Sequence, residues 1–361
     1  MKYIRTYETE EKFLTDKDST SRGFRLKPTL YKYSEAGDHV HLELDDPRKH
    51  GNSTYMEITL DSDTNYPFNF CICNKSGDTQ TTMTCTIDWG DDTIETKTIT
   101  KDNYGFKLAH NYVAGSYKIE LYDVERDYSM VGNAVNRDSL ISPRNSVKRV
   151  VLDERVVSIE HSAFSGCSSL KSIYLPEGIT SIKYWAFRLC SSLVYINIPK
   201  GVTIIESNAF GLCSSLKSIY IPEKVTSIEN NAFYGCSSLK SIYIPEKVTS
   251  IRSNAFYGCS SLTSIDIPEK VTSIGSSAFY NCSSLKSIDI PEKVTSIGDS
   301  AFQDCSSLNS ISSFNLTTPT LGGNIFLNLP TNGTLHIKPG ATGYDAWLSK
   351  LPEGWRIVED L

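Results

Sequence analysis

The sequence predicts a repeat solenoid, an array of short coils stacked along one axis, preceded by a β-sandwich. Two observations predict the solenoid. Seven cysteines stand 23 residues apart in one unbroken series: Cys167, Cys190, Cys213, Cys236, Cys259, Cys282 and Cys305. Prolines from Pro176 to Pro291 and Ala-Phe pairs from Ala163-Phe164 to Ala301-Phe302 keep the same spacing. A fixed period of this length is typical of solenoids, because one coil cannot bury its own apolar face and stacked coils can.

Each repeat is expected to form one short strand with inward residues at an L-x-x-I-x-I spacing, as at Leu239, Ile242 and Ile244. Proline then ends the strand because it cannot donate the next ladder hydrogen bond. A second inward pair follows on the return path, and Ala-Phe closes the coil. We therefore expect a β-rich array of seven 23-residue repeats over residues 147–313, with one continuous core and with end caps.

The repeat pattern A-F-x-x-C-x-S-L-x-S-I-x-I-P-x-x-V-T-x-I resembles the BspA-type, or Treponema-type, leucine-rich repeats, and it covers about half of the chain. The resemblance implies a bacterial surface or secreted protein that binds a ligand on a host or neighbouring cell. It implies no catalytic residues.

Composition narrows the function classes. The net charge of −6 argues against a nucleic-acid partner, which requires a basic face. No run approaches the roughly 18 apolar residues of a membrane-spanning helix, so we expect no membrane insertion. Residues 1–10 lack the apolar stretch of a signal peptide, which leaves export by another route, a removed leader or a non-secreted protein open. No G-x-S-x-G, H-E-x-x-H or phosphate-binding loop occurs, so we expect neither an enzyme nor a cofactor.

The seven repeat cysteines share one register of the solenoid. Stacked coils lie roughly 4.8 Å apart, so these side chains are expected to form a ladder in the apolar core. Metal sites need cysteines paired as C-x-x-C or combined with histidine, and neither pattern occurs. We therefore expect reduced, buried thiols and no metal.

Residues 51–125 alternate as short strands, which indicates a β-sandwich. Trp89-Gly-Asp-Asp92, followed by His110-Asn-Tyr112, resembles the polycystic-kidney-disease (PKD) type of immunoglobulin-like domain, although the turn is one residue short and has Asp92 in place of glycine. That resemblance implies a spacer or binding module. The aspartates of this turn could hold calcium, but aspartate in tight turns more often accepts bonds from its own backbone.

The remaining segments flank these two parts. Residues 1–50 form an N-terminal segment, in which residues 28–42, P-x-L-Y-x-Y-S-E-A-G-D-x-V-H-L, resemble the opening of phage fibre or decoration proteins. Residues 126–146 are polar and predict a linker. The first coil after them has Asp153 where the repeat has proline, as a capping coil should differ.

Residues 314–361 predict a C-terminal cap. Its aromatic and leucine residues at i, i+3, i+4 and i+7 indicate an amphipathic helix that begins near Thr342 as its cap: Tyr344, Trp347, Leu348 and Leu351. The aromatic side chains are expected to cover the end of the core.

The outward positions of successive strands predict a ligand platform on one face of the solenoid, with an adjacent basic column. Its residues are Tyr174, Tyr195, Lys217, Tyr220, Lys240, Tyr243, Asp266 and Asp289. Exposed tyrosine offers flat contact area at low entropy cost, and evenly spaced rungs suit an extended protein or glycan. The alternative is drift at tolerant surface positions.

Two function classes therefore remain: a non-enzymatic adhesion or ligand-binding protein of a bacterial surface, and a structural virion component of a phage of gut bacteria. The repeats and the sandwich favour the first or fit both, whereas the segment at residues 28–42 and the lack of a signal peptide favour the second. Oligomeric state and ligand identity stay open.

Overall fold

The structure is a computed structural model of the whole chain. It describes residues 54–60, 68–74, 79–101, 105–122, 124, 127–130, 132–133, 138–139 and 144–361, and the backbone of β1 (Leu30–Tyr33) and β2 (His39–Leu42). The chain divides into two units, residues 1–52 and 53–361. In the first unit, β1 and β2 pair antiparallel. The rest of residues 28–42, which carry the phage resemblance, lies outside the described residues.

The second unit begins with a sandwich of two sheets that pack around alternating apolar side chains, as the sequence predicts. Strands β3, β8, β5 and β6 pair in that order in one sheet, and β9, β4 and β7 in the other. The strands are β3 (Thr54–Leu60), β4 (Phe68–Asn74), β5 (Thr82–Asp88), β6 (Ile94–Thr100), β7 (Phe106–His110), β8 (Gly115–Tyr122) and β9 (Tyr128–Met130). A short pair, β10 (Gly132–Asn133) and β11 (Asp138–Ser139), and a 3₁₀ turn, η3 (Arg144–Ser146), follow.

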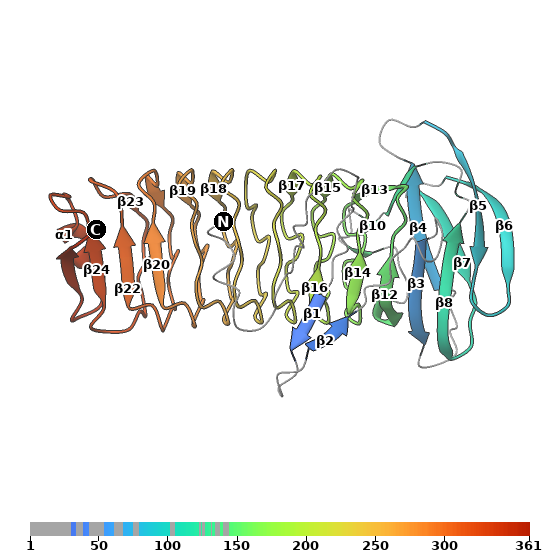
Figure 1. Cartoon of the computed structure of the whole chain (residues 1–361), viewed down its shortest axis with the longest axis horizontal. Helices are drawn as coiled ribbons and strands as arrows, with labels where there is room; N and C mark the ends of the chain where they lie inside the picture. The colour runs from blue at the N-terminus through green and yellow to red at the C-terminus, as the bar shows by residue number, and fades with distance from the viewer. Residues whose placement is uncertain are drawn as a thin grey trace. The chain divides into compact units, whose positions relative to one another are not determined.

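Beyond the sandwich the chain winds into stacked coils, which confirms the predicted solenoid (Figure 1). Each coil contributes one extended segment to each of two rows, and neighbours pair in parallel one repeat apart, as Ser172 pairs with Tyr195. One row contains β12 (Val147–Val151), β14 (Ser172–Tyr174), β16 (Tyr195–Ile196), β20 (Ser287–Ile290), β22 (Ser310–Ser313), β24 (Thr334–Ile337) and β25 (Arg356–Glu359). The other contains β13 (Val156–Ile159), β15 (Ser181–Ile182), β17 (Ile204–Ile205), β18 (Ser250–Ile251), β19 (Ser273–Ile274), β21 (Ser296–Ile297) and β23 (Thr320–Leu321).

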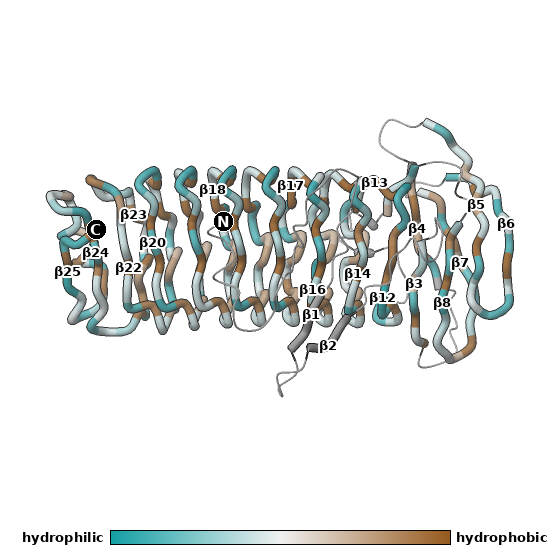
Figure 2. Tube along the Cα trace, in the orientation of Figure 1, coloured by the Kyte–Doolittle hydropathy of each residue, from teal (hydrophilic) through white to brown (hydrophobic). Residues whose placement is uncertain are grey.

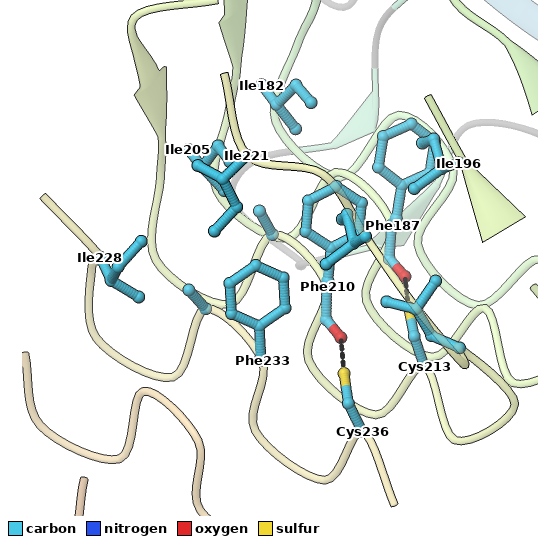
Figure 3. Packing of buried hydrophobic residues seen from close by; sticks show 14 of the residues in the cluster. Ile182, Phe187, Ile196, Ile205, Phe210, Cys213, Ile221, Ile228, Phe233 and Cys236 are labelled. Carbon is cyan, nitrogen blue, oxygen red and sulfur yellow. Dashed lines mark hydrogen bonds between the residues drawn. The ribbon is translucent and has the colours of Figure 1, made fainter. Parts of the chain in front are cut away.

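The core of the solenoid is a stack of identical side chains. From Phe164 to Phe302 the phenylalanine rings lie parallel, with neighbouring centroids 5.4 to 5.7 Å apart. The repeat cysteines are fully buried and free, and from Cys190 to Cys305 each thiol donates to a phenylalanine carbonyl of the preceding coil, as Cys236 Sγ does to Phe210 O at 3.2 Å (Figure 3). This confirms the predicted cysteine ladder. Figure 2 shows hydrophilic turns along the upper edge of the coils and more hydrophobic turns along the lower edge.

Both sheets of the sandwich continue into the solenoid. β3 pairs with β12, and β9 pairs with β13, so each sheet passes into one of the two rows. The predicted linker therefore contains a strand: Tyr128–Met130 is fully buried between β4 and β13. The polar residues around this strand do not indicate it in the sequence, because its burial comes from pairing with segments distant in the chain.

A buried polar cluster forms the joint between sandwich and first coil. Asp153, 1% exposed, accepts bonds from Tyr128 OH at 3.1 Å, from Arg155 Nη2 at 2.9 Å and from the Arg155 amide at 2.7 Å. Thr54 Oγ1 lies 2.6 Å from Tyr128 OH, and Arg155 Nη1 donates to Val124 O at 2.7 Å. Asp153, which the sequence singled out as a departure from the repeat, thus joins the first coil to strands of both sheets.

The C-terminal residues cover the last coil. Phe326 extends the phenylalanine stack, and Trp347 packs against it with ring centroids 5.7 Å apart. Tyr344, Trp347 and Trp355 are buried, as the sequence predicts for a lid on the core. The helix is shorter than expected: α1 spans Asp345–Leu348, starts after Tyr344 and has no side-chain cap. Thr342 instead bridges to Thr317 and donates its amide to Leu316 O, so it is not the cap.

Candidate ligand-binding face

The predicted platform lies on the outward side of the row that contains β14, β16 and β20, which we term the strand face. In each coil the leucine and isoleucines of L-x-x-I-x-I point inward and are buried, as Leu193, Ile196 and Ile198 are. The residues between them therefore point outward, because side chains alternate along an extended segment. The regular period then aligns equivalent positions of successive coils into columns.

One column contains most of the predicted tyrosines and both aspartates. Asn197 bridges Tyr220, and Tyr220 bridges Tyr243. Continuing the β14–β16 register places Tyr174 beside Asn197. The same period continues through Asp266 and Asp289, and Asp289 pairs with Ser312. The column runs Tyr174, Asn197, Tyr220, Tyr243, Asp266, Asp289, so it is aromatic over the early coils and acidic over the later ones.

Tyr220 and Tyr243 form the most ordered part of this column. Their rings are nearly parallel, with an interplanar angle of 9° and centroids 6.2 Å apart. Both hydroxyls are within hydrogen-bonding distance of the Glu223 carboxylate, at 3.3 Å for Tyr220 and 3.5 Å for Tyr243. Tyr220 is 36% exposed. Glu223 thus lies within reach of both tyrosine hydroxyls and holds the two rings on adjacent coils to one acceptor.

Tyr195 lies on the same face but in a different column. It pairs with Ser172 rather than with Tyr174, so its neighbours along the axis are the repeated serines Ser172 and Ser218. The sequence placed four tyrosines on one face, and the register separates this one by two positions. The difference follows from the two-residue alternation, which puts two outward residues on each strand.

The basic column is separate from the tyrosine column. Lys217 and Lys240 are exposed, and the Lys240 amide donates to Lys217 O across the coils. Lys217 precedes Tyr220 by three residues, a separation of roughly 10 Å along an extended segment. The strand face therefore has two parallel columns of outward side chains, one mostly cationic and one aromatic or acidic.

The aspartate turn of the sandwich makes local bonds. Asp88 Oδ1 accepts from the Gly90 amide at 2.8 Å, and Asp91 Oδ1 from the Thr93 amide at 3.2 Å, while Asp91 Oδ2 lies 2.7 Å from His110 Nε2. Burial opposes ionisation of Asp91, but the bonds from His110 and Thr93 outweigh it and lower the pKa of this carboxyl. These contacts fit the interpretation that the aspartates bond their own turn.

Among the described residues, no cluster of three or more His, Cys, Asp or Glu side chains could hold a metal ion. In the same residues no helix is both long and apolar enough to cross a bilayer.

Stacked coils of 23 residues with a flat face of aligned side chains define a leucine-rich-repeat solenoid. The chain belongs to the family of the BspA type leucine rich repeat region, whose model matches residues 142–259 and 226–340 in six copies, together more than half of the chain. No curated protein matches it.

Solved structures of other leucine-rich-repeat proteins are similar to this chain. A leucine rich cell surface protein from Faecalibacterium prausnitzii is 34% identical over 45% of this chain and 52% of its own, with a TM-score of 0.36. The leucine rich repeat protein of T. pallidum is 26% identical over 59% and 87%, with a TM-score of 0.37. A leucine-rich repeat protein from Bacteroides ovatus is 23% identical over 58% and 77%, with a TM-score of 0.26. The chain spans about half the length of the F. prausnitzii protein.

Proposed function

We propose that this protein is a non-enzymatic binding protein of a bacterial cell surface that holds a protein or glycan ligand along its strand face. The observation that carries the proposal is the pair of parallel rings of Tyr220 and Tyr243, on adjacent rungs and anchored by one carboxylate. Side chains held in place before binding lose less entropy when a ligand docks.

The spacing of the columns supports an extended ligand. Equivalent residues recur once per coil, roughly every 4.8 Å, so a linear chain can repeat the same contact along the axis. The aromatic half offers stacking surface at Tyr174, Tyr220 and Tyr243, whereas the later half offers exposed carboxylates at Asp266 and Asp289. A ligand on this face would therefore carry apolar or planar groups toward the early coils and cationic or hydroxyl groups toward the later ones.

Location and class rest on the family. Membership of the BspA type family implies a bacterial surface or secreted protein, and the F. prausnitzii relative is by its name a cell surface protein. No catalytic motif occurs in the sequence. We propose the sandwich as a spacer of the PKD-like type, which the stacking of Trp89 on His110 at 4.9 Å and the Tyr112 bond to Trp89 O at 2.7 Å support.

A virion component is the weaker candidate. It rests on the resemblance at residues 28–42, most of which lie outside the described residues. None of the relatives reported above is a phage protein. We therefore favour the cell-surface protein.

The test is the double substitution Tyr220→Ala and Tyr243→Ala in the full chain. Glycan and peptide arrays probed with the wild-type protein supply a ligand, and titration gives its affinity. We expect binding to weaken at least about tenfold, roughly 1.4 kcal/mol. The free energy of unfolding should change by no more than roughly 0.5 kcal/mol per site, as is usual for surface substitutions.

The matched control is Ser264→Ala with Ser287→Ala, two exposed residues of the same face outside the tyrosine column. It should leave both affinity and melt unchanged. An unchanged affinity in the tyrosine variant with an intact fold would reject the strand face as the binding surface. A loss of several kcal/mol in the free energy of unfolding would show that the tyrosines stabilise the fold instead.

A further inference from the structure

The repeats provide an internal reference for each position of a coil, and the second and third coils depart from it most clearly at the left-handed backbone positions. One such position follows the T-S-I strand of every coil, and Trp185 occupies it with φ 59°. All the other coils have asparagine or serine there: Ser162, Asn208, Asn231, Asn254, Ser277, Ser300 and Asn324. Asparagine tolerates this conformation, whereas a bulky aromatic residue there is a genuine outlier.

A second left-handed position follows the Ala-Phe pair. Leu189 and Leu212 occupy it with φ 64° and 63°. The other coils have glycine, asparagine or aspartate there: Gly166, Gly235, Gly258, Asn281, Asp304 and Asn328. Three bulky residues thus adopt a costly backbone conformation within two adjacent coils. Backbone strain of this kind clusters at ligand-binding sites, where a function retains it.

These side chains do not compensate for the strain by entering the core. Leu189 is 39% exposed, and Trp185 and Leu212 are partly exposed. Across residues 147–313 the exposed large hydrophobic side chains are Leu189, Val194, Ile204 and Tyr220. Val194 and Tyr220 lie on the strand face and Ile204 lies in β17, so at this turn the exposed Leu189 adjoins the partly exposed Trp185 and Leu212. Apolar side chains that are exposed together mark an interaction site, whereas scattered ones do not.

The aromatic residues at this turn are held in place. Tyr184 packs against His161 and Trp185, with ring centroids 4.1 and 4.5 Å away. Glu206 of the next coil accepts from the Tyr184 amide at 3.1 Å and pairs with Lys183 Nζ at 3.3 Å. The turn is therefore ordered before any partner arrives, which reduces the entropy lost on binding.

The turn also carries a cation that no acidic side chain neutralises. Lys183 pairs with Glu206 at 3.3 Å. Within the described part of the chain, the partly exposed Arg188 forms no ion pair. An unpaired guanidinium beside aromatic side chains suits a carboxylate on the partner.

We propose that the Trp185 turn, formed by Tyr184, Trp185, Arg188, Leu189 and Leu212, is a docking surface for a protein segment with aliphatic or aromatic side chains flanked by acidic residues. Trp, Tyr and Arg are the side chains that dominate protein interfaces. The leucines favour a protein over a glycan, because a hydroxyl-rich glycan has few apolar groups that could cover their side chains. This surface is separate from the tyrosine column of the strand face, so it extends the proposed function with a second partner.

The test uses the full chain and an array of random 15-residue peptides. We expect enrichment of peptides in which Leu, Ile, Phe or Trp adjoins Asp or Glu, and binding of the best peptide that weakens with added salt. The triple variant Trp185→Asn, Leu189→Gly and Leu212→Gly replaces each bulky residue with one that other coils have at the same position. It should lose binding at least about tenfold, while its melting temperature stays equal or rises because the strain is relieved.

Two further variants sharpen the result. Arg188→Gln should weaken binding of the same peptide and reduce the salt dependence of that binding. Leu316→Ser with Leu327→Ser, exposed apolar residues outside this turn, should change nothing. The proposal is overturned if no such peptides are enriched, if the triple variant binds them as well as the wild type, or if its melting temperature falls. Glycans that bind in a Trp185-dependent manner without any peptide doing so would overturn it in favour of a sugar site.

Discussion

At the scale of single residues, the repeat cysteines show why one residue type is reused in every coil. The side chain is small enough for the interior and still donates a hydrogen bond to a main-chain carbonyl, as Cys236 does to Phe210. Burial raises the pKa of the Cys236 and Cys305 thiols to about 12 from 9.0. These thiols therefore stay protonated at neutral pH, and only the thiolate is reactive.

We predict that the seven repeat cysteines react slowly with 5,5′-dithiobis(2-nitrobenzoate) in the folded protein at pH 8 and rapidly in denaturant. Because the folded pKa lies above the unfolded value, stability should also fall as pH rises past 9.0, where the unfolded thiols ionise first. The exposed control Ser264→Cys should label at once in the folded state. Fast labelling of several repeat cysteines without denaturant would contradict the prediction.

Asp153 is the residue whose loss should affect the sandwich and the solenoid together. Removing its carboxylate in Asp153→Ala takes one acceptor from the buried Tyr128 hydroxyl and one from the partly buried Arg155 guanidinium. Leaving buried polar groups short of a partner in this way costs about 1–3 kcal/mol. Chemical denaturation should show a lower midpoint, whereas Asp266→Ala, at an exposed aspartate, should not change it. Equal midpoints for the two variants would mean that the cluster does not hold the joint.

At the scale of elements, the coils are held by backbone contact from one turn to the next. The ladder strands are only two to four residues long in most coils, so close approach of turns has to supplement them. Where the path tightens, glycine replaces a larger residue: Gly275, Gly298 and Gly322 stand where earlier coils have Glu229 or Arg252. An added Cβ on Gly298 would lie 2.4 Å from the Ser276 amide nitrogen.

We predict that Gly298→Ala lowers the free energy of unfolding by about 1–3 kcal/mol, because the backbone of the preceding coil must shift to admit the methyl group. Gly178→Ala is the matched control, since its added Cβ would meet the nearest atom at an ordinary 3.7 Å. Denaturation midpoints of the two variants provide the measurement. A neutral Gly298→Ala would show that the coils are less tightly spaced than described here.

At the scale of the described unit, both ends of the solenoid core are covered by different means. At the start, β3 and β9 of the sandwich pair with β12 and β13 of the first coil. At the end, Trp347 covers the phenylalanine stack, and Trp355 donates its indole N–H to Pro330 O at 2.8 Å. A stack of coils without such covers would expose an apolar cross-section.

We predict that deletion of residues 314–361 exposes the ring of Phe302 and the apolar residues around it. Exposed apolar patches of this kind drive association. The truncated protein should aggregate or melt over a broader range, as measured by size-exclusion chromatography and calorimetry. A monomeric truncation with an unchanged melt would show that the C-terminal cap is dispensable.

The 23-residue period by itself determined the solenoid, its buried cysteine and phenylalanine ladders, and the outward positions of the strand face. Periodicity carries this information because equivalent residues in stacked coils must meet equivalent neighbours. The alternating strands of residues 51–125 likewise determined a sandwich. Of the candidate site, the sequence placed Tyr220 and Tyr243 in one column.

Only the tertiary structure decided how these parts combine. The strand Tyr128–Met130 lies in a polar segment and pairs with β4 and β13. Local strand propensity could not predict it, because the pairing joins residues far apart in the chain. Thr342 is no helix cap because α1 begins only at Asp345, so Tyr344 occupies the cap position. The orientation of the tyrosine hydroxyls toward Glu223 and the left-handed conformation of Trp185 are properties of the packed coils. Both depend on neighbours that the stacking of coils brings into contact, and the residue pattern alone does not predict those contacts.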